Sequence, residues 1–430
     1  MRVLITGATG LIGAAVVARL LAEGHAVTGI ARDVRRAERR LPEVNWISFD
    51  MAAATSPEAW LPVLAGAEAV VNCAGVLQDG MGESVKGVHA EGAAALFAAC
   101  EHAGVRRVVH FSAIGVDRET PSQFSETKRQ GEETLMQTGL DWVILRPSVV
   151  VGRSAYGGSA LFRGLAALPV LPVMPGTGPL QIVQLGEVID TVLFFLRANA
   201  PSRVALELAG PERLSFPEVV QHYRRWLGWK QARLMHLPAW AANLLYKLGD
   251  FAGSLGWRPP MRSTTQREIT RGAVGDPGEW TRLTGIVPRT LPAELAATPP
   301  SVQERWFAGL YILKPAIFTV FSLFWIFTGI ISLTAGYGIG VNLMLEGGAG
   351  RLAAPSVVAG ALADILIGVA IAVRQTSRLG LYAALAITVF YIVAGTVLVP
   401  RLWADPLGPM LKIWPILAFN LVALAIQEDR

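Results

Sequence analysis

A long stretch without charged side chains constrains this chain more than any other feature. No Asp, Glu, Lys or Arg lies between Pro315 and Leu345. A helix of about 20 apolar residues is enough to cross the hydrocarbon layer of a bilayer, where a helix also satisfies its own backbone hydrogen bonds. The last third of the chain is therefore predicted to form an all-α transmembrane domain of four helices, at Tyr311–Ala335, Leu352–Val373, Leu379–Val399 and Met410–Gln427.

Composition supports this division of the chain. At 430 residues the chain is long enough for two or three domains. Its content of 52% hydrophobic and 17% charged residues is too apolar for an ordinary soluble protein. The net charge of +5 favours contact with anionic lipid over nucleic acid, so we expect no nucleic-acid partner. Cys73 and Cys100 lack metal-ligand spacing and predict no metal site.

The first 150 residues alternate between short apolar runs and helical stretches. Helices such as Ile12–Glu23 and Val88–Ala103 separate the predicted strands, which are Val3–Ile5, Ala26–Ile30, Ala69–Asn72, Arg107–Ser112 and Trp142–Leu145. This alternation predicts an α/β fold with a Rossmann-like, doubly wound parallel sheet. The first predicted strand begins at the start of the sequence, without the cationic leader of a signal peptide, so we expect no signal peptide.

A glycine-rich turn follows the first strand and opens the first helix. Gly7, Gly10 and Gly13 have the spacing that lets a backbone approach a dinucleotide pyrophosphate closely. The amides at the start of the helix would then face the anion. The alternative interpretation is a glycine turn without a ligand, but the strand-turn-helix context favours a dinucleotide.

The end of the second strand bears on the type of cofactor. Arg32 stands where an acidic residue would accept a hydrogen bond from the ribose 2′-OH of NAD, so a cation is placed for the 2′-phosphate of NADP. NADP(H) is therefore favoured, with NAD(H) as the alternative. Arg32 could also simply begin a solvated basic run with Arg35, Arg36, Arg39 and Arg40. Asp50 is expected to meet the adenine and Asn72 to line the cofactor path.

Several motifs together resemble the extended and atypical branch of the short-chain dehydrogenase/reductase superfamily. They are TGATGLIG at Thr6–Gly13, NCAG at Asn72–Gly75, FSAIG at Phe111–Gly115, Lys128 followed by Gly131-Glu132, and LRPSVVVG at Leu145–Gly152. The resemblance implies that Ser112 and Lys128 belong to a catalytic set. It also implies a cofactor site formed by Gly7, Thr9, Gly10, Leu11, Ile12, Gly13, Arg32, Asp50, Asn72, Ala74, Gly75, Ser112, Lys128 and Pro147.

One position departs from that family. Its catalytic tyrosine stands four residues before the lysine, and Phe124 occupies this position here. Phenylalanine has no hydroxyl to carry a proton, and such general acid–base help is typically worth on the order of 10²–10⁴ in rate. His89 either orders a water or is a packed surface histidine. The hydroxyls near Phe124 belong to Ser112, Ser125 and Thr127, of which the last two point elsewhere if Phe124 and Lys128 share a helix face.

Residues 152–300 are expected to form most of a substrate lobe, within a nucleotide-binding domain of residues 1–300. From His222 to Arg289, eleven basic and four acidic residues leave an excess of +7, with five tryptophans interleaved. Apolar residues recur at helical spacing in Leu237–Leu255, at Trp240, Leu244, Leu248, Phe251 and Leu255. Two interpretations stay open, a core helix beside a solvated basic face and an amphipathic surface lying on anionic lipid.

After a linker at residues 301–309, residues 310–430 resemble the DoxX-like membrane family. LWADPLG at Leu402–Gly408, Lys412 and Trp414-Pro415 carry this resemblance, and the four spans agree with it. Asp364 is the only acid inside the second span. It could relay protons, contact a quinone or lipid head group, or pair with Arg401. The alternative is a structural hydrogen bond between helices.

These patterns together predict a multi-pass protein of the bacterial inner membrane. Its nucleotide domain would lie in the cytoplasm, on the side of Arg374 and Arg378. If catalytic, it would reduce a lipid-soluble carbonyl or a quinone-like compound. A nucleotide site with an incomplete catalytic set also resembles the nucleotide-binding accessory subunit of respiratory complex I, in which the nucleotide is implied to be largely structural. The second interpretation is therefore a non-catalytic scaffold, assembly factor or redox sensor of a membrane complex.

Overall fold

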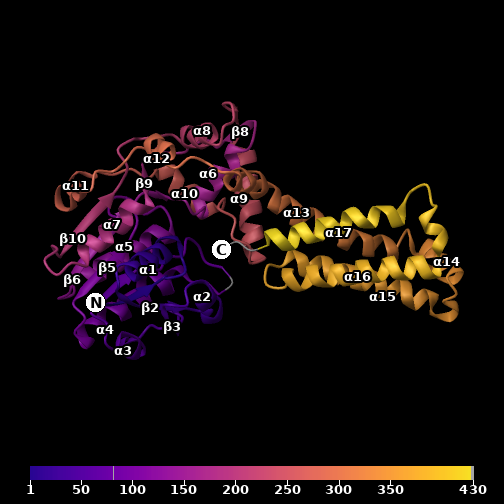
Figure 1. Cartoon of the computed structure of the whole chain (residues 1–430), viewed down its shortest axis with the longest axis horizontal. Coiled ribbons are helices and arrows are strands. Elements are labelled where there is room, and N and C mark those ends of the chain that lie inside the picture. The colour runs from indigo at the N-terminus through magenta and orange to yellow at the C-terminus, as the bar shows by residue number, and fades with distance from the viewer. Residues whose placement is uncertain (81, 428–430) are drawn as a thin grey trace. The chain divides into compact units, whose positions relative to one another are not determined.

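The chain folds into two compact units. The computed structural model describes residues 1–80 and 82–427. The first unit contains residues 1–251 and 259–308, and the second contains residues 252–258 together with the chain from residue 309 onward. The first is built around a parallel sheet, and the second is a bundle of long helices (Figure 1).

Seven parallel strands form the main sheet of the first unit. In chain order they are β1 (Arg2–Thr6), β2 (Ala26–Ala31), β3 (Asn45–Ser48), β4 (Ala69–Asn72), β5 (Arg107–Phe111), β6 (Asp141–Pro147) and β10 (Val204–Leu208). Across the sheet their order is β10-β6-β5-β4-β1-β2-β3. The predicted parallel sheet is thereby confirmed, with β3 as a strand that the alternation pattern did not identify.

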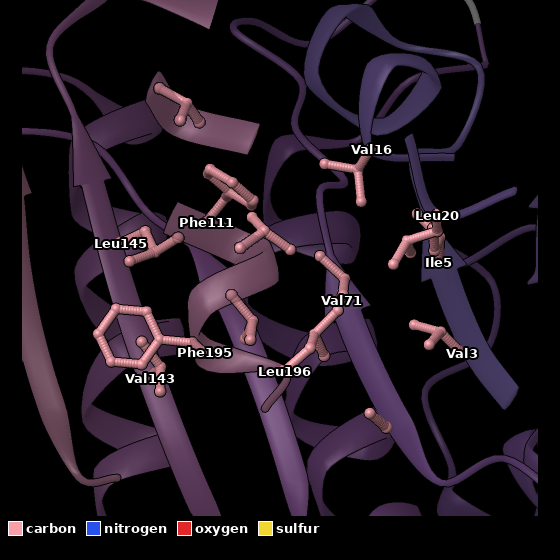
Figure 2. Close-up of a cluster of buried hydrophobic side chains, with 14 of the residues drawn as sticks. Val3, Ile5, Val16, Leu20, Val71, Phe111, Val143, Leu145, Phe195 and Leu196 are labelled. Carbon is pink, nitrogen blue, oxygen red and sulfur yellow. The ribbon is translucent and has the colours of Figure 1, made fainter. Parts of the chain in front are cut away.

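Helices cover both faces of this sheet. They include α1 (Leu11–Ala22) and α7 (Leu185–Phe195) on one face, and α3 (Pro57–Leu64), α4 (Gly92–Ala103) and α5 (Gln123–Met136) on the other. Because successive strand residues point to opposite faces, Val3 and Val71 enter one core while Leu4 and Val70 enter the other. Figure 2 shows the first of these cores, in which Val16 and Phe195 meet side chains of the sheet. The predicted doubly wound fold is confirmed.

The second predicted helix begins with a wider turn. Instead of one α-helix at Val88–Ala103, a π-helical turn η1 (Gly87–Glu91) precedes α4. Glycine allows this turn to approach a neighbouring loop, because a Cβ at Gly92 would lie 2.2 Å from the carbonyl oxygen of Met51. The turn directs His89 into the protein interior, where it is buried.

The smaller lobe contains two short parallel ladders. β7 (Val149–Val151) pairs with β9 (Ile182–Gln184), and β8 (Val170–Val173) pairs with β11 (Arg233–His236). Its helices are α6 (Gly157–Ala166), α8 (Phe216–Trp226), α9 (Ala239–Ser254), α10 (Ser263–Arg271), α11 (Gly278–Thr284) and α12 (Leu291–Ala297). Helix α2 (Val34–Arg40) belongs to the main domain, where it follows β2. Between these lobe elements the chain returns to the main sheet through α7 and β10.

The second unit contains four helices that are long and apolar enough to cross a membrane. The bundle consists of α13 (Val302–Leu333), α14 (Tyr337–Glu346), α15 (Ala353–Ala372), α16 (Ser377–Leu398) and α17 (Pro409–Ile426), with single 3₁₀ turns at Gly350–Leu352 and Pro400–Trp403. Residues 302–309 of the predicted linker are helical, because α13 begins at Val302. Polar residues at that start do not interrupt the helix, because Ser301 and Glu304 form a terminal hydrogen-bond pair.

Small residues bring the membrane helices close together. A Cβ at Gly329 would lie 2.4 Å from the carbonyl oxygen of Ala361, and one at Gly368 would lie 2.7 Å from that of Ser322. Helices in lipid gain stability from such close packing, since burial of apolar surface gives them little driving force there. The Ser322 hydroxyl donates to the Gly368 carbonyl at 2.7 Å, so a hydrogen bond joins α13 to α15 at the same contact.

Candidate functional site

The turn between β1 and α1 can be built only from small residues. Gly7 has a φ of +61°, and a Cβ there would lie 2.6 Å from the carbonyl oxygen of Cys73. A Cβ at Gly13 would lie 2.2 Å from the carbonyl oxygen of Gly7. Glycine at both positions therefore allows the strand, the turn and the helix to pack without side chains between them.

The start of α1 presents backbone amides without a competing side chain. Gly10 caps the helix, no side chain among the described residues caps it, and its first turn contains no acid. The first amides of a helix have no partner within the helix and carry a partial positive charge. A pyrophosphate fits this arrangement of amides above a glycine turn. Thr9 is exposed at the tip of the turn, while Leu11 and Ile12 are half-buried behind it.

Asn72 organises the neighbouring strand end. Its Oδ1 accepts a hydrogen bond from the Thr6 hydroxyl at 2.5 Å, and its Nδ2 lies 3.0 Å from Nδ1 of His110. The backbone N–H of Ala74 donates to both Asn72 Oδ1 and Thr6 Oγ1 at 3.3 Å. Asn72 is buried, so the structure gives it the part of shaping the turn after β4 that meets Gly7.

Lys128 connects the ends of two strands from its position on α5. Its Nζ donates to the carbonyl of Phe111 at 2.8 Å and to that of Ala74 at 3.2 Å. An ammonium group has three donors, and Gly75 lies close beside this one, since a Cβ there would be 3.7 Å from Nζ. Lys128 is only 4% exposed, and this burial lowers the pKa of its amine to about 8.

Ser112 directly follows β5, beside the same strand ends. Its backbone N–H donates to the Leu145 carbonyl at 2.8 Å, which fixes the residue against β6. Its buried hydroxyl has no hydrogen-bond partner among the described residues. Buried hydroxyls in folded proteins nearly always have a partner. The Ser112 hydroxyl is therefore available to a bound molecule.

Phe124 lies one helical turn before Lys128 and contacts His89. The two ring centroids are 5.5 Å apart and the rings meet at 78°, edge to face. The expectation of a surface histidine is wrong, because His89 is 2% exposed. Its Nε2 accepts from the Val76 N–H at 3.0 Å, and its Nδ1 lies 3.1 Å from the Thr127 hydroxyl. With both ring nitrogens bonded to protein, His89 has none left to order a water.

Electrostatics also keep His89 out of proton transfer. Burial, and then the nearby positive charge of Lys128, hold the pKa of His89 well below its usual range. The ring is therefore neutral at physiological pH. The accepting Nε2 requires that its proton be on Nδ1, which donates to Thr127. His89 consequently acts as a fixed spacer between the turn after β4 and α5.

The other hydroxyls of this part of α5 are directed away from the site. The Ser125 hydroxyl donates to Glu268 of α10 at 2.8 Å, and Ser122, the residue that caps α5, also bonds Glu268. The Thr127 hydroxyl donates to the Gln123 carbonyl at 2.8 Å. The face of α5 that carries Lys128 therefore presents the ring of Phe124 where a proton donor would stand.

A buried ion pair fixes α5 against the sheet, and sequence reasoning gave it no role. Arg146 Nη2 lies 2.6 Å from Glu132 Oε2, and Arg146 Nη1 lies 2.7 Å from Asp117 Oδ2. Gly131 allows the helix to pack closely, since a Cβ there would be 2.5 Å from the His89 carbonyl oxygen. The available signal was an arginine within the otherwise apolar run of β6, because buried charges in proteins are usually paired.

Arg32, Asp50 and Pro147 are all engaged with the protein itself. Arg32 donates to the Gly82 carbonyl at 2.6 Å and pairs with Glu83 at 3.3 Å. Asp50 accepts from the Ala52 N–H at 3.1 Å within its own turn. The Pro147 carbonyl accepts from the Ile114 N–H at 3.1 Å. The geometry at the end of β2 therefore does not distinguish NADP from NAD.

Inside the membrane bundle, Asp364 binds Tyr391. The tyrosine hydroxyl donates to Asp364 Oδ1 at 3.1 Å, which joins α15 to α16. The predicted pairing of Asp364 with Arg401 is wrong, because Arg401 forms an ion pair with Glu346. Both residues of that pair are substantially exposed near the ends of their helices. No group of acidic, histidine or cysteine residues suited to a metal ion occurs in the described residues.

Comparison with protein families assigns each unit. Residues 7–161 match the NAD(P)H-binding family, and residues 322–421 match the DoxX-like family. The first curated relatives are uncharacterized mycobacterial proteins, 29% identical over 51% of this chain, and the match spans only 23% of their length. The matched half of this chain therefore spans only about a quarter of the length of those relatives.

Two further relatives and one solved structure are informative. The chain is 27% identical to the ceramide reductase of Caulobacter vibrioides over 55% of its own length and 73% of that enzyme. It is 25% identical to the mitochondrial 40 kDa subunit of NADH-ubiquinone oxidoreductase of Neurospora crassa, over 64% of this chain and 72% of that subunit. The Bordetella bronchiseptica enzyme WbmG, solved with NAD and UDP, shares the fold with a TM-score of 0.55 and 16% identity. The match covers 72% of this chain and 96% of that enzyme.

These matches agree with the geometry of the glycine turn and with the four apolar helices. The chain joins an NAD(P)-binding domain with a Rossmann-like fold to a DoxX-like domain whose four long helices are apolar enough to cross a membrane.

Proposed function

We propose that this protein is a membrane-anchored, NADPH-dependent reductase of a lipid-soluble carbonyl or quinone-like compound. The observation that carries the proposal is the buried hydroxyl of Ser112, which has no hydrogen-bond partner in the described part of the chain and lies next to Lys128 at the strand ends that meet the glycine turn. The ceramide reductase relative supports it, because the name of that enzyme gives a lipid as its substrate. The membrane domain would keep the site close to such molecules.

Each residue of the site has a distinct part in this proposal. The amides at the start of α1 would bind the pyrophosphate, and Lys128 would bind the nicotinamide ribose. When bound, the reduced nicotinamide supplies a hydride. The Ser112 hydroxyl would donate a hydrogen bond to the oxygen of the substrate and stabilise negative charge as it develops there.

Phe124 favours one class of substrate over another. Reduction of a simple ketone leaves an alkoxide, which needs a proton during the reaction, and Phe124 cannot supply it. Reduction of a quinone leaves a phenolate, whose conjugate acid has a pKa of about 10 in an ordinary phenol such as tyrosine. This anion is stable enough to leave the site and take its proton from water. We therefore prefer a quinone-like substrate to a simple ketone.

The proposed location is the bacterial inner membrane, with the nucleotide domain in the cytoplasm, where the reduced nicotinamide would be supplied. In the second unit, Arg258, Lys314, Arg374 and Arg378 lie toward one end of the spans. The other end has Arg351, Arg401 and Lys412 together with Glu346 and Asp405. The excess of basic residues at the first end, four against three, is small but has the sign that supports a cytoplasmic location for that end.

The first experiment identifies the nucleotide and tests its turnover. The full chain would be purified in mild detergent, its bound nucleotide released and identified by mass spectrometry, and NADPH oxidation followed after adding a short-chain quinone. We expect NADPH to be oxidised, and Ser112→Ala to slow the reaction while nucleotide binding persists. Arg129→Met is a matched control on the exposed side of α5, where Arg129 pairs with Glu133.

A second candidate function is a nucleotide-bound scaffold or assembly factor of a membrane complex. Phe124 favours it, and so does the similarity to a subunit of NADH-ubiquinone oxidoreductase. In that case NADPH should remain bound and reduced in the presence of quinones, carbonyl lipids and total membrane lipid extract. That outcome, with the nucleotide confirmed by mass spectrometry, would overturn the reductase proposal and support the scaffold.

A further inference from the structure

Helix α9 has two opposite apolar faces, of which one packs into the lobe and the other carries exposed side chains. The inner face packs into the lobe through Ala242, Tyr246, Gly249 and Gly253. It packs closely, because a Cβ at Gly249 would lie 1.7 Å from the Met261 carbonyl oxygen. The outer face carries a stripe of exposed side chains, at Trp240 (71% exposed), Leu244 (50%), Leu248 (53%) and Phe251 (63%). The expectation of a simple core helix is therefore wrong.

A strand that lies close to α9 in the chain also exposes apolar side chains. β11 ends at His236, three residues before α9 begins, and all four of its residues are exposed. Leu234 and Met235 in this strand are each about half exposed, as is Val170 of the paired strand β8. In register, Leu234 lies opposite Leu171 and Arg233 opposite Val170. An exposed apolar stripe such as that on α9 usually marks an interaction site.

The C-terminal end of α9 leads directly into the membrane unit. The Leu255 carbonyl accepts from the Arg374 N–H at 2.9 Å, and Trp257 Nε1 donates to the Ala372 carbonyl at 2.7 Å. The Trp257 ring also packs against Phe318 of α13, with 4.9 Å between centroids. Ala372 is the last residue of span α15, so Trp257 lies at the end of a span. Phe251 precedes Trp257 by only six residues, which keeps the stripe within reach of the bilayer surface.

The composition of the surface identifies its occupant as lipid. Many basic residues predicted to face lipid are instead bonded inside the domain, such as Arg224 to the carbonyl of Ala166 and Arg271 to Glu268. Arg233 and Lys247 remain exposed beside the apolar stripe. An amphipathic helix with a tryptophan, leucines and flanking cations is the pattern of a helix that lies in the membrane interface.

We propose that the outer face of α9 lies in the surface of the same bilayer that the four spans cross. This inference deepens the proposed function, on which its substrate route rests. Asp250 on α9 accepts from Gln78 at 3.3 Å and also binds Ser263 and Arg262. Gln78 belongs to the loop after β4, next to the strand ends of the site. The same helix thus contacts lipid on one side and the loop beside the nucleotide site on the other, a route for a bilayer-borne substrate.

Spin labels on the full-length protein in liposomes test this contact. Cys73 and Cys100 would be replaced by alanine, and one nitroxide would be attached at Leu244→Cys, Leu248→Cys or Asn243→Cys. Asn243 is the matched control, because it is exposed on the polar flank of the same helix. Collision rates would be measured with oxygen, which concentrates in lipid, and with a nickel chelate, which stays in water. We expect the ratio of oxygen to nickel collisions to be about five-fold higher at positions 244 and 248 than at 243.

Two outcomes would overturn the proposal. Equal ratios at the three positions would place the stripe in water. Low collision rates with both reagents at positions 244 and 248 would instead show that protein covers the stripe, for example a second copy of this chain. The measurement needs no substrate, so lipid contact can be established even if NADPH oxidation fails, and NADPH oxidation can be established even if the stripe faces water.

Discussion

The turn between β1 and α1 and the first two turns of α5 differ in how completely they match a reductase site. In the first region, each position that needs a glycine has one, and the helix start is open to an anion. In the second region, Lys128 is held by two carbonyls, but Phe124 stands in place of a proton donor. The comparison teaches that nucleotide binding and proton transfer depend on different elements, so one can be complete without the other.

The largest expected effect comes from removing this difference. Phe124→Tyr places a hydroxyl one helical turn before Lys128, on the same face of α5. We expect reduction of a lipid-soluble ketone to rise by about 10²–10⁴ over the parent protein, the usual contribution of general acid–base help. NADPH oxidation with matched ketone and quinone substrates would measure it, and the gain with the quinone should be smaller.

Phe124→Leu is the control for this change, because it alters the ring without adding a hydroxyl. It should show no gain with either substrate. If Phe124→Tyr reduces neither a ketone nor a quinone while it still binds NADPH, the first region serves binding alone and the scaffold interpretation is favoured.

The second prediction concerns the ion pair that holds α5 in place. Glu132→Gln leaves Arg146 buried with Asp117 as its remaining carboxylate. Breaking a buried pair by removing one partner typically costs about 3–5 kcal/mol, so we expect a loss near 3 kcal/mol in the free energy of unfolding. Thermal unfolding in detergent would report it. Glu133→Gln is the matched control on the same helix, because the exposed Arg129–Glu133 pair should contribute less than about 1 kcal/mol.

The third prediction concerns a substitution that disrupts the turn between β1 and α1. Gly7→Val forces a β-branched residue to a φ of +61° and pushes its Cβ against the Cys73 carbonyl. We expect nucleotide affinity to fall by at least about 100-fold, because the amides of the turn and of α1 can no longer contact the phosphates together. Titration calorimetry with NADPH would measure the loss.

Gly24→Val separates backbone strain from loss of the site. Gly24 has a φ of +80°, but nothing lies within 4 Å of the position of its Cβ. This variant should lose stability through strain while its affinity for NADPH stays within about two-fold of the parent value. If both variants lost affinity for NADPH to a similar extent, this result would contradict a specific role of the Gly7 turn in nucleotide binding.

Local patterns predicted the regions that depend on local rules. The spacing of Gly7, Gly10 and Gly13 and the apolar spans reflect backbone geometry and hydrophobicity along a short segment, and both can be recognised without tertiary information. The burial of His89 could not be predicted in this way, because it depends on contacts with Val76 and with Thr127, which lie far apart in the chain. For α9 the helical spacing was visible, but which apolar face is covered depends on the segment near Met261 that packs against it.

The smallest predicted effect concerns pH, and it acts where the two regions meet. Because burial lowers the pKa of Lys128 from 10.5 to about 8, its positive charge is lost as pH rises through about 8. Affinity for NADPH should therefore fall by roughly ten-fold above that pH, since the amine then attracts the phosphates and the ribose oxygens less strongly. Lys128→Met should bind more weakly at pH 7 and show little further change between pH 7 and 9.

Stability should change in the opposite direction over the same range. Between pH 8 and 10.5 the unfolded chain binds a proton at Lys128 that the folded chain does not, so this residue makes the free energy of unfolding rise with pH. Its contribution is complete above pH 10.5 and is lost as pH falls through about 8. The difference between the parent protein and Lys128→Met, measured by thermal unfolding without nucleotide, isolates this term. If affinity and stability both fell together, the pH effect would come from general loss of structure, and Lys128 would not be the charge that links nucleotide binding to α5.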